Sequence, residues 1–357
     1  MANKRFEKIL RNMEKHNMDQ MLITSTSSIF YLTGKWIEPG ERLLALYMNT
    51  QGIKKLYINE LFPINEKLDV DKIVYNDSED PIKMLSKDVE EKGTMGIDKQ
   101  WPSHFLIRLM NIKDGLNFTN GSPVIDEVRM IKDEEEINLM REASNINDKA
   151  MSDLVKTISS EYNEKKVGKI LDGIYEKYGT PSFSFSPLIA YGPNAAEPHH
   201  SSDNTPLKKG DSVILDIGGK TNYYSSDMTR TVFYKEASEK QREIYKIVLE
   251  ANLKGIDAVK PGVKFSDIDN AARGVIEKAG YSKYFTHRTG HNIGIDVHEF
   301  PDVSKVNDMI VKPGMTFSVE PGIYLTGEFG VRIEDLVLVT ENGCEVLNKY
   351  TKEMQII

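Results

Sequence analysis

Residues 213–231 read VILDIGGKTNYYSSDMTRT, and they predict the architecture of the C-terminal part of the chain. Asp216 follows an apolar run, where a buried carboxylate without a partner would be driven to protonate. Polar and apolar residues alternate around Asp227, which is typical of a returning strand, so we expect a β-hairpin. A turn centred on residues 221–222 would set Asp216 directly opposite Asp227, with Thr229 on the same face. The two carboxylates would then be close enough to share bound ions.

The same construction occurs a second time. The stretch TFSVE ends at Glu320, and the later stretch GVRIEDLV contains Glu334. A turn centred on Gly327 would set Glu320 opposite Glu334. Arg332 shares the face of Glu334 by the two-residue period of a strand, and its charge would hold the carboxylates ionised and oriented. One facing acid pair is more often a solvated or salt-bridged pair of strand residues, but two such hairpins with histidines nearby indicate a metal site.

Five of the seven histidines lie in two clusters. We predict that His291 is a metal ligand and that His287, four residues earlier, orients it or a metal-bound water. His199 and His298 would be available to donate hydrogen bonds to a substrate carbonyl or a tetrahedral oxyanion. A single histidine is more often a satisfied structural residue, and we expect this of His200.

Four carboxylates and one imidazole form the donor set that two hard divalent cations need and that a folded core otherwise avoids. We therefore predict a dinuclear site with two divalent metal ions. The oxygen-rich donors favour manganese, with cobalt as a substitute in vitro and zinc as a less active occupant. Such ions would activate a water and polarise a scissile carbonyl, with Glu320 as the proton shuttle. The predicted ligands are Asp216, Asp227, His291, Glu320 and Glu334.

Four groups of residues carry a family resemblance, and they read DIG at 216–218 with SDMTRT at 226–231, TGHNIG at 289–294 with VHE at 297–299, SVEPGIY at 318–324, and GVRIED at 330–335. They resemble the motifs of the pita-bread metallopeptidases, a family that includes methionine aminopeptidase, aminopeptidase P, prolidase and creatinase. The resemblance covers essentially the whole chain. It implies a pita-bread catalytic domain and a metal-dependent peptidase.

The resemblance also implies roles for individual residues. It gives the same five ligands, with Asp227 and Glu334 bridging the two ions and Glu320 beside the nucleophilic water. One departure is Asn292, where the family usually has glycine, and this would alter the shape of the loop. Residues at the family's substrate-contacting or orienting positions, and therefore candidates for catalysis, are His199, His298 and Arg332.

The N-terminal third of the chain resembles the added domain of prolidases and aminopeptidases P. Residues 34–46, 77–81 and 192–199 are similar to those of short bacterial prolidases, which cut Xaa-Pro dipeptides. In those enzymes a loop matching residues 38–42 reaches the active site of the neighbouring subunit, although such a sequence can also be an ordinary polar turn. The resemblance thus implies a homodimer and a proline-containing substrate. The implied substrate-contacting residues are His199, His287, Arg288, His298, Glu41 and Arg42.

Several alternatives to an Xaa-Pro dipeptidase share parts of this pattern. An Xaa-Pro aminopeptidase would use the same chemistry on longer peptides, and activity on Ala-Pro against Arg-Pro-Pro separates the two. A non-enzymatic binding module on this fold would have lost metal ligands. A metal-storage protein would leave the other histidines without a task. Creatinase shares the fold without using metal, and the intact ligand set argues against that branch.

The order of predicted elements divides the chain into residues 1–122 and 123–357. Helical periodicity at 4–17, followed by alternating strands and helices, predicts an N-terminal α/β domain that ends where Asn-Gly-Ser-Pro interrupts the pattern. The second part contains two helices and a hairpin, and then the same order again. This predicts an α+β catalytic domain with pseudo-twofold symmetry and the metals on a shared sheet.

Composition limits the possible partners and compartments. The chain has 357 residues, a net charge of −8, 39% hydrophobic residues and one cysteine, which fits a two-domain soluble enzyme. There is no basic stripe, so nucleic acid is not expected as a partner. Residues 1–18 carry repeated charges and no apolar run of about 18 residues follows, so we expect a cytoplasmic protein without membrane contact. Cys344 has no intrachain disulfide partner and is expected to be inert.

Overall fold

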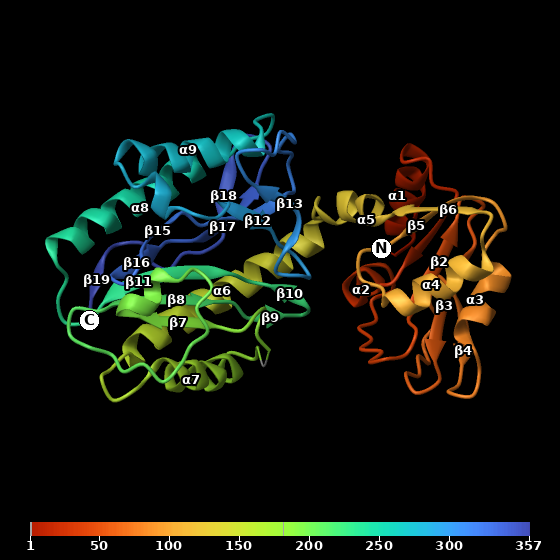
Figure 1. The fold of residues 1–357 in the computed structure, drawn as a ribbon, viewed down its shortest axis with the longest axis horizontal. Coiled ribbons are helices and arrows are strands. Elements are labelled where there is room, and N and C mark those ends of the chain that lie inside the picture. Colours follow the sequence, from red (N-terminus) through yellow and green to blue (C-terminus); the bar gives the residue numbers. More distant parts are fainter. Residues whose placement is uncertain (1, 181) are drawn as a thin grey trace. The chain divides into compact units, whose positions relative to one another are not determined.

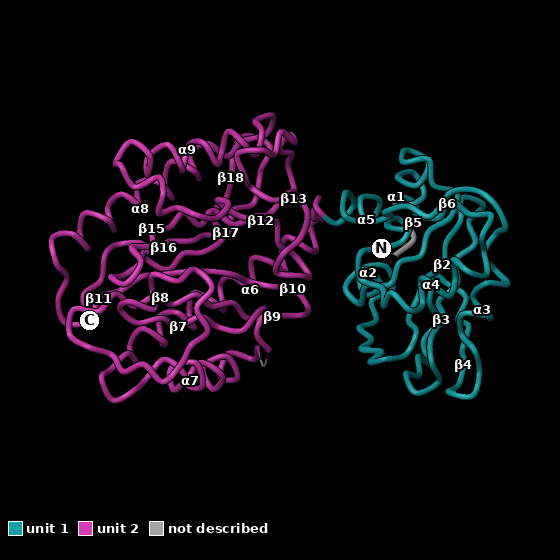
Figure 2. Tube along the Cα trace, in the orientation of Figure 1, with its two compact units in different colours: residues 1–129 teal, residues 130–357 magenta. Residues whose placement is uncertain are grey.

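The computed structural model describes residues 2–180 and 182–357. The chain divides into two compact units, Met1–Arg129 and Met130–Ile357 (Figure 2). The domain boundary predicted between residues 122 and 123 falls within helix α5 (Ser122–Arg129), whereas the first unit includes the whole helix. The reason is packing: α5 lies on α1 (Ala2–Lys15), where the side-chain amide of Asn12 donates to the carbonyl of Val124 at 3.1 Å.

The first unit is an α/β domain, as predicted. Its six strands lie in the order β4-β3-β2-β1-β5-β6, and β1 pairs antiparallel with β2 and parallel with β5. Tyr47, Tyr57 and Met95 are among the buried side chains of its core. The elements not yet given are β1 (Gln20–Ile23), α2 (Thr26–Thr33), β2 (Ala45–Asn49), β3 (Lys54–Asn59), β4 (Asp71–Tyr75), α3 (Pro81–Asp88), β5 (Gly93–Ile97), α4 (Ser103–Ile112) and β6 (Leu116–Asn120).

The second unit begins with two helices, of which the first starts at a capping box formed by Asp133 and Glu136. These helices pack through residues such as Leu154 and Leu171 against the four-stranded sheet β19-β11-β8-β7. The elements are α6 (Glu134–Thr157), α7 (Glu164–Lys177), β7 (Leu188–Tyr191), the 3-10 helix η1 (Gly192–Ala196), β8 (Ser212–Ile217), β9 (Lys220–Thr221), β10 (Tyr224–Ser225), β11 (Met228–Phe233) and β19 (Gln355–Ile356).

Two helices followed by antiparallel strands then occur again, as the sequence predicts. The strands of this half form the sheet β13-β12-β14-β17-β18 and the separate pair β15-β16. Figure 1 shows α8 and α9 along one side of the strands of this unit and α7 along the other. The elements are α8 (Glu239–Asp257), α9 (Phe265–Lys278), η2 (Ser282–Tyr284), β12 (Gly290–Asn292), β13 (Glu299–Val303), β14 (Thr316–Val319), β15 (Gly322–Leu325), β16 (Phe329–Arg332), β17 (Asp335–Val339) and β18 (Cys344–Val346).

The first predicted hairpin has a different register. Asp216 of β8 pairs with Thr229 of β11 and not with Asp227, so the expectation that the two acids lie directly opposite each other is wrong. The turn is centred one residue later than predicted, because Asn222 and Tyr223 both adopt positive φ angles, 48° and 70°. A two-residue shift keeps side chains on their original face, so Asp227 still projects to the same side as Asp216.

The second hairpin has the predicted register. The turn is centred on Gly327, whose φ of +77° suits glycine, and Gly322 pairs with Arg332. The pairing of β14 with β17 continues the register of β15 and β16 on the other side of a break in the ladder. Glu320 and Glu334 lie opposite each other within this break. Their backbone N–H groups donate to other segments instead, Glu320 to Thr289 at 2.8 Å and Glu334 to Thr229 at 3.1 Å. The break therefore ties this hairpin to β11 and to the segment before β12.

Among the described residues, no helix combines the length and the apolar composition needed to cross a bilayer.

Candidate metal centre

A cavity of about 850 Å³ lies in the second unit, and residues of that unit line it. The structure brings ten of the twelve predicted site residues to this cavity. The other two, Glu41 and Arg42, belong to the first unit, where Arg42 forms two hydrogen bonds of 2.8 Å to Asp77. The ten lining residues are His199, Asp216, Asp227, His287, Arg288, His291, His298, Glu320, Arg332 and Glu334.

The predicted ligands form a compact cluster of donor atoms. One donor atom each from Asp227, His291 and Glu334 lie within 4.8 Å of one another. Nε2 of His291 is 3.6 Å from a carboxylate oxygen of Asp227 and 3.5 Å from one of Glu320. Asp216 is held by a guanidinium N–H of Arg332 at 2.6 Å. The carboxylates of Asp227 and Glu334, which repel each other when both are ionised, are therefore held close together.

Burial and mutual repulsion favour the protonated form of the carboxyl groups when no cation is present. Burial raises the pKa of Glu320 to about 7, although the charge of Arg332 opposes this. The pKa values of Asp227 and Glu334 lie well above their usual range, first because of burial and then because of the neighbouring carboxylates. A bound cation would favour the ionised form of these acids at neutral pH.

The donor set fits bound divalent cations. One oxygen of Asp216 and one of Asp227 are buried and have no hydrogen-bond partner among the described residues. Such atoms normally have a partner, and oxygen atoms of carboxylates are the ligands that hard cations prefer. Two carboxylate oxygens without a hydrogen-bond partner lie beside carboxyl groups with raised pKa values. This combination fits a metal centre better than a network of salt bridges.

His291 is oriented as a ligand. Its Nδ1 lies 3.1 Å from the carbonyl of Asn292, and because a carbonyl only accepts, Nδ1 carries the proton. The lone pair of Nε2 then faces the carboxylates. Burial, reinforced by His298, lowers the pKa of His291 to about 3, so the imidazole is neutral over the physiological range.

Arg332 connects the ligands to a hydrogen-bonded network. Besides Asp216, it donates to the hydroxyl of Thr229 at 3.0 Å and to that of Tyr324 at 2.9 Å. Thr229 in turn donates to Glu334 at 2.7 Å. The charge of Arg332 therefore acts on ligands from both hairpins.

Tyr324 was not predicted to be a site residue, although the two-residue strand period places it on the face of Glu320. Both ring nitrogens of His287 are engaged, by the Tyr324 hydroxyl at 2.8 Å and by the Arg288 carbonyl at 2.7 Å. His287 therefore orients the Tyr324 side chain and not His291, and its alternative role toward a metal-bound water stays a prediction. Burial, with the charge of Arg332, lowers the pKa of His287 to about 4.

Three further histidines, His199, His200 and His298, line the cavity beside the ligands. The ring of His298 packs edge-on against that of His291, with centroids 4.2 Å apart. Burial, followed by the charge of Arg288, lowers the pKa of His298. A neutral imidazole carries one N–H donor, which is the group that a polarised carbonyl oxygen accepts. His199 lines the same cavity.

Two family models cover the chain. Residues 138–341 match that of metallopeptidase family M24, and residues 5–131 match the creatinase/prolidase N-terminal domain. The chain is a member of metallopeptidase family M24. The family and the two-domain fold that the sequence motifs predict are thereby confirmed.

Relatives of this M24 peptidase match it over nearly their full length. An uncharacterized peptidase of Staphylococcus aureus (strain MRSA252) is 35% identical over 357 residues, with 98% of this chain and 99% of the relative covered. The crystal structure of a dipeptidase from Pyrococcus horikoshii OT3 has a TM-score of 0.94 at 36% identity, covering 99% of this chain and 100% of that one. A prolidase from Thermococcus sibiricus has a TM-score of 0.95 at 34% identity, covering 100% and 99%.

Proposed function

We propose that this M24 peptidase hydrolyses Xaa-Pro dipeptides with the help of two divalent metal ions, which we propose to be manganese. The observation that carries the proposal is one cavity in which clustered carboxylates, a neutral imidazole ligand and further histidines, His199 and His298 among them, surround the same space. The similarity to a dipeptidase and a prolidase over the full chain supports the dipeptide as substrate.

The ligands would be Asp216, Asp227, His291, Glu320 and Glu334, with Asp227 and Glu334 shared between the two ions. When bound, the ions would supply an activated water and polarise the scissile carbonyl.

Residues of the chain would manage the protons and charges of the reaction. Glu320 reaches the cavity with a partly exposed side chain and would take up and return a proton. His298 and His199 would donate to the carbonyl oxygen as negative charge develops on it, an effect worth about 3 kcal/mol per donor. Arg332 would hold Asp216 in place through its 2.6 Å hydrogen bond.

Arg288 is the proposed partner of the substrate carboxylate. Its side chain is half-exposed in the cavity lining, and one of its nitrogens lies 3.9 Å from a carboxylate oxygen of Asp302. That distance is too long for a strong hydrogen bond, so the guanidinium retains donors for a planar carboxylate.

A homodimer would complete the site. The cavity volume of about 850 Å³ is near the upper end of the range for drug-sized ligands, so a dipeptide alone would leave space. We propose that the loop with Glu41 and Arg42 of a second copy closes this space and excludes longer peptides.

The test is a substrate panel with enzyme reconstituted with Mn²⁺. Ala-Pro should be hydrolysed. Arg-Pro-Pro should be cleaved at least about tenfold more slowly, since its second residue offers no free carboxylate to Arg288, and so should Ala-Ala, which lacks the proline ring. Faster cleavage of Arg-Pro-Pro than of Ala-Pro would instead identify an Xaa-Pro aminopeptidase. Cleavage of Ala-Ala as fast as Ala-Pro would contradict proline specificity.

A further inference from the structure

One buried carboxylate, that of Glu164, lies behind the loop that carries His199. Glu164 is the first residue of α7, and its side chain has no exposed surface. One of its oxygens accepts hydrogen bonds from the backbone N–H of Tyr191 at 2.8 Å and from the side-chain amide of Asn194 at 3.0 Å. This oxygen therefore holds the start of the loop.

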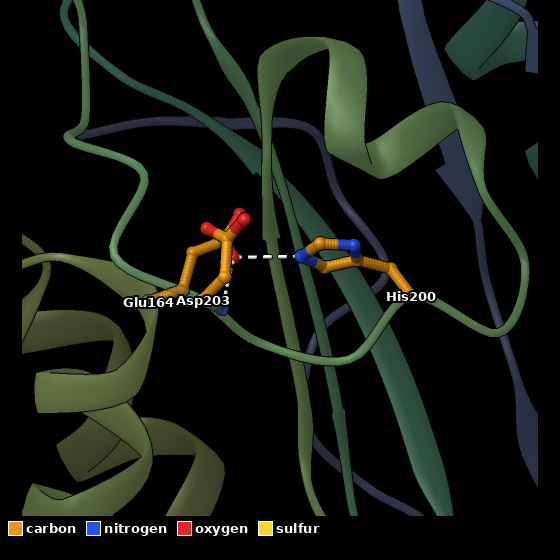
Figure 3. A group of neighbouring side chains, drawn as sticks. All are labelled: Glu164, His200 and Asp203. Carbon is orange, nitrogen blue, oxygen red and sulfur yellow. Dashed lines mark hydrogen bonds and ion pairs between the residues drawn. The ribbon is translucent and has the colours of Figure 1, made fainter.

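The second oxygen of Glu164 holds the end of the same loop. It accepts from the backbone N–H of Asp203 at 2.8 Å and lies 2.7 Å from Nε2 of His200 (Figure 3). Because a carboxylate only accepts, Nε2 of His200 is the donor. Four donors spread over residues 191–203 thus converge on one side chain, and a hydrogen bond to a charged acceptor is stronger than one between neutral groups.

The cluster of Glu164, His200 and Asp203 is compact enough to be considered as a cation site. The groups around Glu164 argue against a cation, because four N–H donors present their positive ends to it. The carboxylate of Asp203 accepts from the backbone N–H of Thr205 at 2.7 Å. The cluster is organised to hold a loop.

The opposite side of the loop is fixed against the metal-centre hairpin. The carbonyl of Pro198 accepts from Arg332 at 3.4 Å. At Gly330 of β16, a Cβ atom would lie 1.9 Å from the carbonyl oxygen of Ala195, so the loop backbone lies directly on this strand. His199 is therefore flanked by one residue tied to Arg332 and one tied to Glu164.

We propose that Glu164 and His200 are positioning residues that hold His199 in the geometry needed for catalysis. The inference rests on the catalytic role proposed for His199. Glu164, which has no exposed surface, acts through the loop, and His200 lines the cavity but has its Nε2 bonded to Glu164. A displacement of a catalytic group by about 1 Å costs about 10²-fold in rate, so loss of the anchor should reduce turnover without removing metal.

The first experiment compares kcat for Ala-Pro in matched variants. Glu164→Gln keeps the side-chain volume but replaces an acceptor oxygen with an NH₂ group, and kcat should fall by about 10- to 100-fold with unchanged metal content. Glu176→Gln, the same change at an exposed position of α7, should leave kcat unchanged. His200→Gln retains a donor near the position of Nε2 and should keep more activity than His200→Ala.

The decisive experiment is a double-mutant cycle with His199→Ala. If Glu164 acts by positioning His199, Glu164→Gln should have no further effect on kcat in the His199→Ala background. A purely structural role would lower kcat by the same factor in both backgrounds, and this result would overturn the proposal, as would a wild-type kcat in Glu164→Gln. If the wild-type enzyme prefers another dipeptide, the cycle is measured on that substrate, so that failure of proline specificity and failure of the anchor give different results.

Hydrogen exchange provides a readout that does not depend on turnover. Glu164→Gln and His200→Ala should each increase exchange at the amides of residues 191–203 while the amides of β8 keep wild-type protection. Unchanged exchange in this loop in both variants would also contradict the anchor. Because His200→Ala removes one of the four donors and leaves the other three, it remains informative if Glu164→Gln does not fold.

Discussion

At the scale of single residues, the metal centre is a set of acids whose burial favours the protonated form. The pKa of Glu320 is raised to about 7, and those of Asp227 and Glu334 are raised well above their usual range, with burial as the first cause of each. For an acid with a raised pKa, the stabilising effect of the bound proton is complete below the usual pKa near 4. It is lost as the pH rises through the raised value.

This gives a prediction for stability with and without metal. The chelated enzyme should lose stability between pH 5 and pH 7.5, and Mn²⁺ should raise the melting temperature more at pH 7.5 than at pH 5.5, since protons compete with the ion at lower pH. His291, with a pKa lowered to about 3, should not contribute to this difference. Differential scanning calorimetry of both forms measures it. An equal Mn²⁺ effect at the two pH values would contradict the account.

A second prediction separates catalysis from metal binding. His298→Ala should reduce kcat by about 10²-fold or more, because a donor to the developing oxyanion is lost, and metal content should stay near that of wild type. His104→Ala, at an exposed position of α4 in the first unit, is the matched control and should change neither quantity. Steady-state kinetics and metal analysis of both variants decide. A parallel loss of metal would make His298 a ligand.

At the scale of elements, a buried arginine joins the strands that carry the ligands. Arg230 of β11 donates to the carbonyls of Thr229 and Glu334 and pairs with Asp335 at 2.8 Å. Burial alone would raise the pKa of Asp335, but the charges of Arg230 and Lys352 hold it below the usual value. This fully buried pair fixes β11 against β17.

Removal of Arg230 should therefore be costly. Arg230→Met would leave Asp335 buried with a single partner, and the free energy of unfolding should fall by about 3–5 kcal/mol. Arg141→Met removes an exposed arginine that pairs with Glu345, and it should cost less than about 1 kcal/mol. Urea denaturation of the chelated proteins gives both values. A small loss for Arg230→Met would show that the pair does not hold these strands together.

The two hairpins show how far local sequence predicts elements. Glycine at position 327 identified the centre of the second turn, because glycine adopts positive φ easily, and the register followed. In the first hairpin, two non-glycine residues, Asn222 and Tyr223, adopt positive φ. The alternation of polar and apolar residues along this hairpin did not identify the centre of its turn. The face of Asp216 and Asp227 was still predictable, because an even shift in register preserves it.

The supporting residues of the site were harder to predict than the ligands. Buried acids conflict with their surroundings in the sequence itself, so Asp216 and Glu320 were noticeable. Glu164 and Tyr324 follow ordinary helix and strand patterns. Their partners, such as Asn194 and Arg332, are found only when distant segments are brought together. Local periodicity contains no information on such contacts.

At the scale of the whole molecule, the proposed dimer predicts complementation between two defective chains. An Asp227→Asn protein lacks a ligand but has an intact loop, whereas a Glu41→Ala/Arg42→Ala protein has the reverse. In a randomly mixed population with twofold pairing, about one quarter of the sites would combine intact ligands with an intact loop. These sites should hydrolyse Ala-Pro and reject Arg-Pro-Pro. A fully active and selective monomer in sedimentation experiments would contradict the arrangement.

The dinuclear metal centre is tested most directly by titrating Mn²⁺ into the chelated enzyme while Ala-Pro hydrolysis and bound metal are measured on the same samples. We predict negligible activity without metal and a rise to a plateau at about two ions per chain. In the Glu334→Gln variant, no addition of Mn²⁺ should restore turnover. Full activity in metal-free protein, or a plateau at one ion per chain, would contradict the proposed site.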